Sequence, residues 1–378
     1  MNLFLLKKTL LITLLISSVA NCFSQNILLS DKANVSVITC DTGNESYSLF
    51  GHTAIRIKDI THNFDAVYNY GAFDFSTPNF IPKFVKGDLQ YFAVANTFSD
   101  FMSQYTYEKR SVFEQELNLP LFYKQKLYDN LTHALASSES YYTYKFIDKN
   151  CTSMVVEILN KTLGSNIIVK KVDTDKTYRS ILYPYFDNSF YEKLGTSIIF
   201  GKKVDEQGNR IFLPLELQKN LKLISFQHHL LSKESTILLD YKKEISHSIW
   251  DNFYTFSLLL GFIIIINKKE TDLFYFSIIG ILGLFFAFIG FYSLHKELGY
   301  NYNILLFNPA LLVLFYFILK RNNKWIINLS LINLGFLLLY LILMFNKVYL
   351  LIVSPLMITS AVLLIKTISR NLKRIIII

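Results

Sequence analysis

The sequence predicts an α+β domain carried across a membrane, followed by an all-α membrane domain of about five helices. Three observations support this fold class. A short basic and apolar segment opens the chain, a mixed pattern with most of the charge follows to about residue 245, and long apolar stretches fill the rest. Hydrophobic residues make up 52% of the 378 residues and the mean hydropathy is +0.31, too apolar for a wholly soluble protein.

The first 24 residues are typical of a secretory signal peptide. Two lysines, Lys7 and Lys8, precede an apolar core of about ten residues, which is too short to span a bilayer comfortably. Cleavage is expected after Ser24. The alternative is that "VANC" is a degenerate lipobox, in which case Cys22 would become an acylated N-terminus. After cleavage the exported domain, residues 25–245, retains two cysteines, Cys40 and Cys151.

Alternating apolar and polar residues in the exported domain predict a sheet. The expected strands lie at 34–40, 52–59, 64–73, 91–97 and 111–119. A helical pattern at 121–137 follows Pro120, and a second helix runs from Asn150 to Leu163, where Gly164 ends it. A tyrosine-rich section at 171–224 is expected to form loops and short helices.

The membrane domain, residues 246–378, contains five apolar stretches, each near the length needed to cross hydrocarbon as a helix. They lie at about 250–266, 273–294, 304–319, 325–345 and 348–368. Five spans take the chain from an exported domain to a cytoplasmic C-terminus. The two connections predicted outside hold only Lys296 and Lys347, and the cytoplasmic ones hold Lys268, Lys269, Lys320, Arg321, Lys324, Arg370, Lys373 and Arg374. This asymmetry fits the positive-inside rule. These loop residues also account for much of the net charge of +9, so the charge does not indicate a nucleic-acid partner.

Cys151 and His52 are the candidates for chemistry. Asn150 is a plausible N-cap, so Cys151 stands at a helix start, where the helix dipole and a nearby imidazolium lower a thiol pKa. Free backbone N–H groups of that first turn can stabilise an oxyanion. His52 begins a strand, and a hairpin around 59–63 would place it opposite Asn69 or Tyr70. Asn69 would orient the imidazole, with Asp65 as the alternative.

Other interpretations of the two cysteines stay open at this point. Cys40 and Cys151 could form a disulfide in an oxidising compartment. Cys40 could equally be a buried thiol or an accessory residue of the site. Its position at a strand end offers no helix dipole, so Cys151 is the better candidate nucleophile.

Four segments together resemble the Lnb family of bacterial lipoprotein N-acyltransferases. They are "TCDTGNESYSLFGHTAIRIKD", "VYNYGAFDFSTPNFIPKFVKGDLQY", "YKFIDKNCTSMVVEIL" and, in the membrane half, "HKELGYNYNILLFNP". A strand histidine followed by "NC" at a helix start also resembles the circularly permuted NlpC/P60 papain-like fold. The chain departs from the family pattern after Cys40, where "DTG" replaces an expected "PG".

The resemblance implies a two-step acyl transfer. Cys151 would take an acyl chain from a membrane phospholipid as a thioester, and the α-amine of a diacylated lipoprotein cysteine would accept it. His52 would serve as the acid and base. No metal or soluble cofactor is implied, and the bacterial inner membrane with a periplasmic exported domain is the expected location.

Further residues are candidates for contact with substrate. His295 lies in a short outer loop, where polar groups could bind a lipid headgroup or simply form an interfacial loop. The complete set is Asn150, Tyr70, His295, Asn301 and Asn303. The aromatic segment 69–88 is either a lip that dips into the membrane or packing over the sheet. The pair His228 and His229 lacks partners for a metal site.

Two other functions compete with acyl transfer. The same cysteine and histidine would serve a hydrolase, either a phospholipase or a peptidoglycan amidase. The five spans argue against the amidase, because a wall enzyme needs no such partner. The third possibility is a receptor or assembly module of the envelope that has lost activity, for which replacing Cys151 would change nothing.

Overall fold

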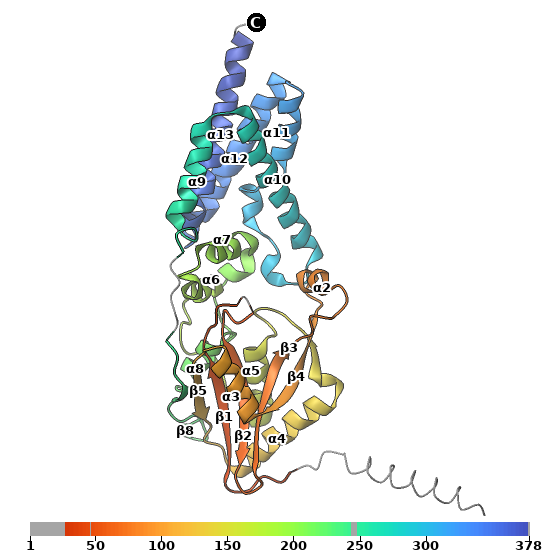
Figure 1. The fold of residues 1–378 in the computed structure, drawn as a ribbon, viewed down its shortest axis with the longest axis vertical. Coiled ribbons are helices and arrows are strands. Elements are labelled where there is room, and N and C mark those ends of the chain that lie inside the picture. Colours follow the sequence, from red (N-terminus) through yellow and green to blue (C-terminus); the bar gives the residue numbers. More distant parts are fainter. Residues whose placement is uncertain (1–26, 46, 243–247, 377–378) are drawn as a thin grey trace, which may run out of the picture.

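The computed structural model describes residues 27–45, 47–242 and 248–376 (Figure 1). The signal peptide predicted at 1–24, with Cys22, lies outside these residues. So does the predicted boundary between the two domains at residue 245. The described chain forms an α+β half and an elongated helical half, arranged end to end along the long axis.

A seven-stranded antiparallel sheet forms the centre of the exported half. Its order is β6-β4-β3-β2-β1-β5-β9, with bounds Tyr141–Thr143, Gln90–Thr97, Phe64–Ala72, His52–Asp59, Ala33–Cys40, Val112–Glu116 and Thr236–Leu239. A separate ribbon pairs β7 (Ser225–Phe226) with β8 (His229–Leu230). The five predicted strands are confirmed. The edge strands β6 and β9 escaped prediction because three and four residues are too few to show an alternation.

Helices cover both faces of the sheet. The helices of the exported half are α2 (Phe80–Lys86), α3 (Phe98–Tyr107), α4 (Leu121–Ala136), α5 (Cys151–Leu163), α6 (Tyr178–Leu182), α7 (Phe190–Ile199) and α8 (Pro214–Leu221). The larger core lies between the sheet and helices α4 and α5. Helix α3 covers the other face, over a smaller cluster that includes Cys40, Ala54 and Tyr105. Section 171–224 contains α6 to α8 and short 3-10 turns, as expected.

Helix α5 begins where its sequence dictates. The side chain of Asn150 accepts a hydrogen bond from the N–H of Ser153, and the Ser153 hydroxyl accepts one from the Asn150 N–H. This capping box fixes Cys151 as the first helical residue. Gly164 ends the helix with φ at 81°. Loss of such a cap costs about 1 kcal/mol, so the position of Cys151 depends on Asn150.

The second half is a bundle of five apolar helices. Four stretches are long enough to cross a membrane: Lys269–Tyr292, Lys296–Leu319, Asn323–Met344 and Leu350–Lys373. They contain helices α10 (Lys269–Tyr292), α11 (Ala310–Leu319), α12 (Asn323–Met344) and α13 (Leu350–Ile376). The first apolar helix, α9 (Phe253–Ile266), has 14 residues, because Asn252 caps it two residues after the predicted start. At 1.5 Å per residue it is about 21 Å long, shorter than the hydrocarbon core.

The two lysines of the predicted outer connections lie at one end of the bundle. At the end nearer the sheet, Lys296 lies 3.3 Å from Asp148 and Lys347 lies 4.0 Å from Asp205, both carboxylates of the exported half. Helix α13 runs to the opposite end, where the chain terminates (Figure 1). Both lysines predicted to lie outside therefore contact the exported half.

Candidate functional site

The candidate nucleophile and base meet at the end of the sheet that faces the membrane helices. Strand β2 runs away from the helices and β3 runs toward them, so the start of β2 and the end of β3 share that end (Figure 1). His52 is the first residue of β2, and Cys151 is the first residue of α5. Ninety-nine residues separate them in the chain, and only the packing of α5 against the sheet brings them together.

Asn69 orients the imidazole of His52, as the sequence predicts. The His52 Nε2 and Asn69 Oδ1 atoms lie 3.1 Å apart. Because an amide oxygen only accepts, Nε2 carries the proton and Nδ1 is left to receive one from the thiol. The Asn69 amide nitrogen donates to Asn96 Oδ1 at 3.2 Å. Asn96, on strand β4, thus fixes the rotamer of Asn69, and no sequence pattern predicted this contact.

The strand register differs from the predicted one. Asn69 pairs with Ala54 rather than with His52, because β2 and β3 are joined by residues 60–63, with Asn63 in the left-handed region. Asn69 can still contact His52, because residues two apart on one strand share a face and Asn69 is the diagonal neighbour of His52. The alternative orienter, Asp65, lies further along β3 and forms hydrogen bonds of 2.7 and 2.6 Å to Arg56.

The electrostatics of the pair favour a thiolate. Burial raises the pKa of Cys151, but the charge and hydrogen bond of His52 outweigh it, and the pKa of the thiol is lowered. Burial lowers the pKa of His52, but the charge and hydrogen bond of Cys151 outweigh this effect, so the pKa of His52 is raised overall. Opposite shifts are what an imidazolium and a thiolate in contact produce. Cys151 as a whole residue is only partly buried, whereas Cys40 is fully buried.

A pair of threonine hydroxyls joins the two elements that carry the site. Thr53 Oγ1 and Thr152 Oγ1 lie 3.0 Å apart, and both side chains are fully buried. Each threonine follows one of the candidate catalytic residues, so this contact fixes β2 against the first turn of α5. The Thr53 backbone N–H also hydrogen-bonds to the Cys151 thiol. This pair was not predicted, because nothing in either segment of the sequence points to the other.

Two glycines make room for this arrangement. A side chain at Gly51, where φ is +82°, would place Cβ 2.5 Å from the Cys40 carbonyl oxygen. At Gly71, where φ is +110°, a Cβ would lie 3.7 Å from Cys151 Cβ and 4.0 Å from His52 Cε1. Both backbone conformations favour glycine. Gly71 therefore keeps open the space beside the thiol and the imidazole.

Cys40 is a free and fully buried thiol, which is one of the alternatives predicted for it. It pairs with His52 across strands β1 and β2. Burial raises the pKa of Cys40 to about 12, and its side chain is hydrogen-bonded to Tyr105. The alternative of a disulfide is wrong in this structure, since Cys151 is free as well.

Asn150 and Tyr70 lie near the site but are engaged by the protein itself. The Asn150 amide nitrogen donates to the carbonyl oxygens of Phe146 and Phe212, at 2.7 and 2.9 Å. Tyr70 is buried, and its ring contacts that of Tyr142 edge on. Contact of either residue with substrate stays a prediction, and the structure assigns to Asn150 the support of the helix start.

His295 contacts helix α2 rather than Cys151 or His52. Its Nε2 lies 3.0 Å from the Phe84 carbonyl oxygen. Two further bonds join the same segments, from the Ser293 hydroxyl to Val85 and from the Leu294 N–H to Lys86, both 2.7 Å. The outer loop of the membrane domain is thus bonded to the last turn of α2.

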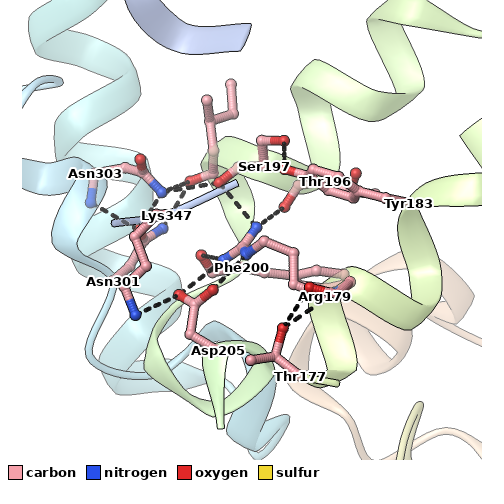
Figure 2. Close-up of polar contacts among 12 residues, drawn as sticks. Thr177, Arg179, Tyr183, Thr196, Ser197, Phe200, Asp205, Asn301, Asn303 and Lys347 are labelled. Carbon is pink, nitrogen blue, oxygen red and sulfur yellow. Dashed lines mark hydrogen bonds and ion pairs between the residues drawn. The ribbon is translucent and has the colours of Figure 1, made fainter. Parts of the chain in front are cut away.

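Asn301 and Asn303 form part of the contact between the two halves (Figure 2). Their side-chain amides donate, at 2.8 to 3.1 Å, to carbonyl oxygens at the end of α7, those of Ser197, Ile198 and Ile199. The last carbonyls of a helix have no partner within it. The two amides supply partners, and both residues are buried. The amides assigned to substrate from the sequence are therefore bound to the protein's own backbone.

Arg179 and Asp205 complete this contact. The buried guanidinium of Arg179 donates to Asp205 at 2.8 Å and to the Phe200 carbonyl oxygen at 3.2 Å. Asp205 in turn faces Lys347 of the loop before α13 (Figure 2). The ring of Tyr349, also in that loop, lies 4.1 Å from the guanidinium carbon. A positive charge at the C-terminal end of α7 is favourable, so the network holds the exported half in place.

No metal site accompanies these residues. Within residues 27–45, 47–242 and 248–376, no three or more His, Cys, Asp or Glu side chains are grouped to hold an ion.

Comparison with known proteins identifies the family. The model of the Lnb N-terminal periplasmic domain matches residues 23–183, and that of the Lnb transmembrane domain matches residues 253–371. Searches of curated proteins and of solved structures returned no match. The two matched ranges contain the sheet, the candidate pair and the helical bundle, and together they cover more than half of the chain. The protein is therefore a member of the Lnb family, with a periplasmic domain followed by a transmembrane domain.

Proposed function

We propose that this protein is a lipoprotein N-acyltransferase. It moves an acyl chain from a membrane phospholipid to Cys151, and from there to the α-amine of a diacylglyceryl cysteine at the N-terminus of a lipoprotein. The candidate Cys–His–Asn arrangement supports acyl transfer through a thioester. Membership of the Lnb family and the apolar helices support substrates that reside in a bilayer.

The observation that carries this proposal is the direct bonding of the nucleophile's own segment to the membrane domain. Lys145 Nζ donates to the Leu294 carbonyl oxygen at 3.3 Å, and the Ile147 N–H donates to Glu297 Oε1 at 3.1 Å. These residues precede Cys151 by six and four positions. A soluble hydrolase would need no such coupling, whereas an enzyme whose two substrates are both lipids needs its thiol held at the membrane surface.

Exposed apolar side chains beside this contact support a lipid substrate. Phe75 and Ile81 are 70% and 71% exposed, and Phe84 is 44% exposed. They lie on and just before α2, the helix that is bonded to the outer end of α10. Large exposed apolar groups next to a membrane helix are favourable only where lipid covers them. This supports the predicted lip, in which the segment before the site contacts the outer leaflet.

The first half-reaction forms the thioester. The Cys151 thiolate attacks the carbonyl carbon of a phospholipid ester, the carbon–oxygen π pair moves onto oxygen, and the tetrahedral intermediate collapses with loss of the lysophospholipid alkoxide. The imidazolium of His52 gives its proton to that alkoxide. Asn69 keeps the ring oriented while the charge on it changes.

The second half-reaction transfers the acyl chain to nitrogen. The lipoprotein α-amine attacks the thioester carbonyl, His52 accepts a proton from the nitrogen, and the Cys151 thiolate leaves. An amide is more stable than a thioester, so this step runs downhill without ATP. We place the enzyme in the bacterial inner membrane with its C-terminus in the cytoplasm, in keeping with the lysine and arginine distribution.

Mass spectrometry of a lipoprotein N-terminal peptide tests the proposal. Cells that lack their own N-acyltransferase would carry this protein or its Cys151→Ser variant. The native protein is expected to add a third acyl chain to the peptide, and the variant none, because a serine hydroxyl beside His52 lacks the low pKa of the thiol. Cys40→Ser serves as the matched control and is expected to keep the third chain.

Other outcomes would favour the competing functions. A diacyl peptide in both strains, with the protein inserted in the membrane, would contradict N-acyl transfer. Free fatty acid released by the native protein alone would then indicate a phospholipase. An unchanged envelope phenotype with Cys151→Ser would indicate a receptor or assembly module.

A further inference from the structure

Tyr142 carries a buried hydroxyl that the described structure leaves without a hydrogen-bond partner. The residue is in the middle of β6 and is only 3% exposed. A buried O–H without an acceptor costs about 1 to 3 kcal/mol. Phenylalanine would fill the same space without that cost, so the hydroxyl calls for an explanation.

The hydroxyl lies at the site rather than in the distant core. The position of a Cβ on Gly71 would be 4.0 Å from the Tyr142 oxygen, 3.7 Å from Cys151 Cβ and 4.0 Å from His52 Cε1. The three groups therefore surround one small volume, which stays open because residue 71 is glycine. Burial raises the pKa of Tyr142, and a charge on Cys151 raises it further, so the phenol stays protonated and is available as a donor.

The first turn of α5 supplies a second kind of donor to the same place. The first four N–H groups of a helix have no acceptor within it. The capping box satisfies two of them: the Asn150 N–H donates to the Ser153 hydroxyl, and the Ser153 N–H donates to the Asn150 side chain. The N–H groups of Cys151 and Thr152 remain for a ligand at the helix start, where the dipole favours negative charge.

We propose that the Tyr142 hydroxyl and the Cys151 backbone N–H together form the oxyanion hole of this enzyme. When the thiolate attacks an ester carbonyl, a carbon–sulfur bond forms and the π pair becomes a lone pair on oxygen. That oxygen accepts hydrogen bonds from both donors. On collapse the lone pair reforms the carbonyl, the carbon–oxygen single bond breaks, and His52 protonates the leaving alkoxide. The Tyr142 proton stays on its own oxygen throughout.

This inference rests on the thioester route of the proposed function and adds a residue to it. Each N–H or O–H donor aimed at a developing oxyanion lowers the barrier by an amount worth about 10²- to 10³-fold in rate. The aromatic neighbours of Tyr142 hold its ring in place. The ring centroid of Tyr70 lies 6.3 Å from that of Tyr142, as does that of Tyr91.

Two reactions of the same thiol in the Tyr142→Phe variant test the assignment. The first is acylation of the full-length protein in nanodiscs by a p-nitrophenyl fatty acid ester, followed as the burst of p-nitrophenol. The second is alkylation of Cys151 by iodoacetamide across a range of pH. Acylation passes through an oxyanion, whereas alkylation displaces iodide and forms none.

The variant is expected to slow the burst by about 10²-fold and to leave the alkylation rate and its pH profile unchanged. Tyr91→Phe is the matched control, since it removes a hydroxyl from the same aromatic cluster, and it is expected to change neither rate. Equal bursts in Tyr142→Phe and the native protein would overturn the inference alone. A parallel loss of both reactions would overturn it too, because Tyr142 would then support packing or the thiolate itself.

The native protein separates this inference from the function on which it rests. If it shows no burst and no acyl group on Cys151 by mass spectrometry, the thioester route fails and the oxyanion hole fails with it. If Cys151 is acylated and Tyr142→Phe slows that step, but no lipoprotein gains a third chain, the oxyanion hole stands. Only the proposed acceptor is then wrong.

Discussion

Two cysteines lie near His52, and they differ in burial and in the direction of their pKa shifts. Cys40 is opposite His52 in the β1–β2 register and fully buried under α3. Cys151 begins α5 and is only partly buried. The pKa of Cys40 is raised to about 12, mainly by burial, whereas that of Cys151 is lowered by the charge of His52.

Closeness to a histidine is therefore insufficient to activate a cysteine. Cys40 is a strand neighbour of His52, but its thiol belongs to the α3 cluster and bonds to Tyr105. Cys151 has the imidazole, the Thr53 N–H and the start of a helix directed at its sulfur. The two thiols therefore differ in their surroundings. Cys40 packs in the core under α3, whereas Cys151 lies at the end of the sheet beside His52.

The largest change in this comparison is expected from removing the imidazole, with His52→Gln. Without it, burial alone would act on Cys151 and raise its pKa. A rise of one in the pKa lowers the thiolate fraction about tenfold at a pH below it. Alkylation of Cys151 by iodoacetamide at pH 6.5 is therefore expected to slow about tenfold or more.

The pH dependence of Cys151 alkylation in the native protein shows in which direction His52 shifts the pKa of the thiol. The pKa of Cys151 is lowered and that of His52 is raised, so both shifts favour the thiolate and imidazolium over the neutral pair. Alkylation is expected to persist below the normal range of a thiol, and His52→Gln should shift its acid limb to higher pH. Cys40 is the internal control and should stay unlabelled until the protein unfolds. An unshifted limb would show that the helix start activates the thiol without His52.

A smaller effect is expected from the threonine contact that holds the pair together. Thr152→Val leaves the buried Thr53 hydroxyl without its partner, which costs about 1 to 3 kcal/mol of unfolding free energy. Activity is expected to fall several-fold, since β2 and the start of α5 lose their direct hydrogen bond.

The double variant Thr53→Val with Thr152→Val separates stability from positioning. Removing both partners of a buried hydrogen bond is close to neutral, so chemical denaturation should show most of the lost stability restored. Activity should stay reduced, because no hydroxyl then joins the two elements. Full activity in the double variant would mean that the hydroxyls only satisfy each other.

The smallest effect is expected from Cys40→Ala. The substitution removes one buried sulfur from the α3 cluster and is expected to lower the unfolding free energy by about 1 kcal/mol. Acyl transfer should stay within about twofold of the native rate at a permissive temperature, since no bond connects Cys40 to the candidate machinery. A loss comparable to that of His52→Gln would instead assign Cys40 to the site.

The distribution of apolar residues predicted most of the architecture. The five central strands, helices α4 and α5, and the apolar spans follow from local patterns, because a half-buried strand and a membrane helix each impose a periodicity or a length. Cys151 at a helix start follows from Asn150 and Ser153, which are close in sequence. The pairing of His52 with Cys151 came from the linked motifs of the family rather than from spacing.

Side-chain contacts between residues far apart in the chain could not be predicted from local sequence patterns. Asn69 was predicted to face His52 through a register that proved to be different, and Asn96 was not predicted at all. The contact between Thr53 and Thr152, 99 residues apart, left no trace in either segment. His295, Asn301 and Asn303 looked like lipid contacts because they are polar residues in an outer loop.

Local patterns along the chain are sufficient to predict the classes of element, the two halves, the helix start that carries Cys151 and the charge asymmetry of the loops. Each depends on residues within about one turn or one strand of each other. Three-dimensional packing determines which thiol contacts the imidazole, which hydroxyl is left without a partner beside it, and which outer-loop amides bind the exported half. Those outcomes depend on sheet register and on packing between distant segments, where a shift of one residue turns a side chain to the opposite face.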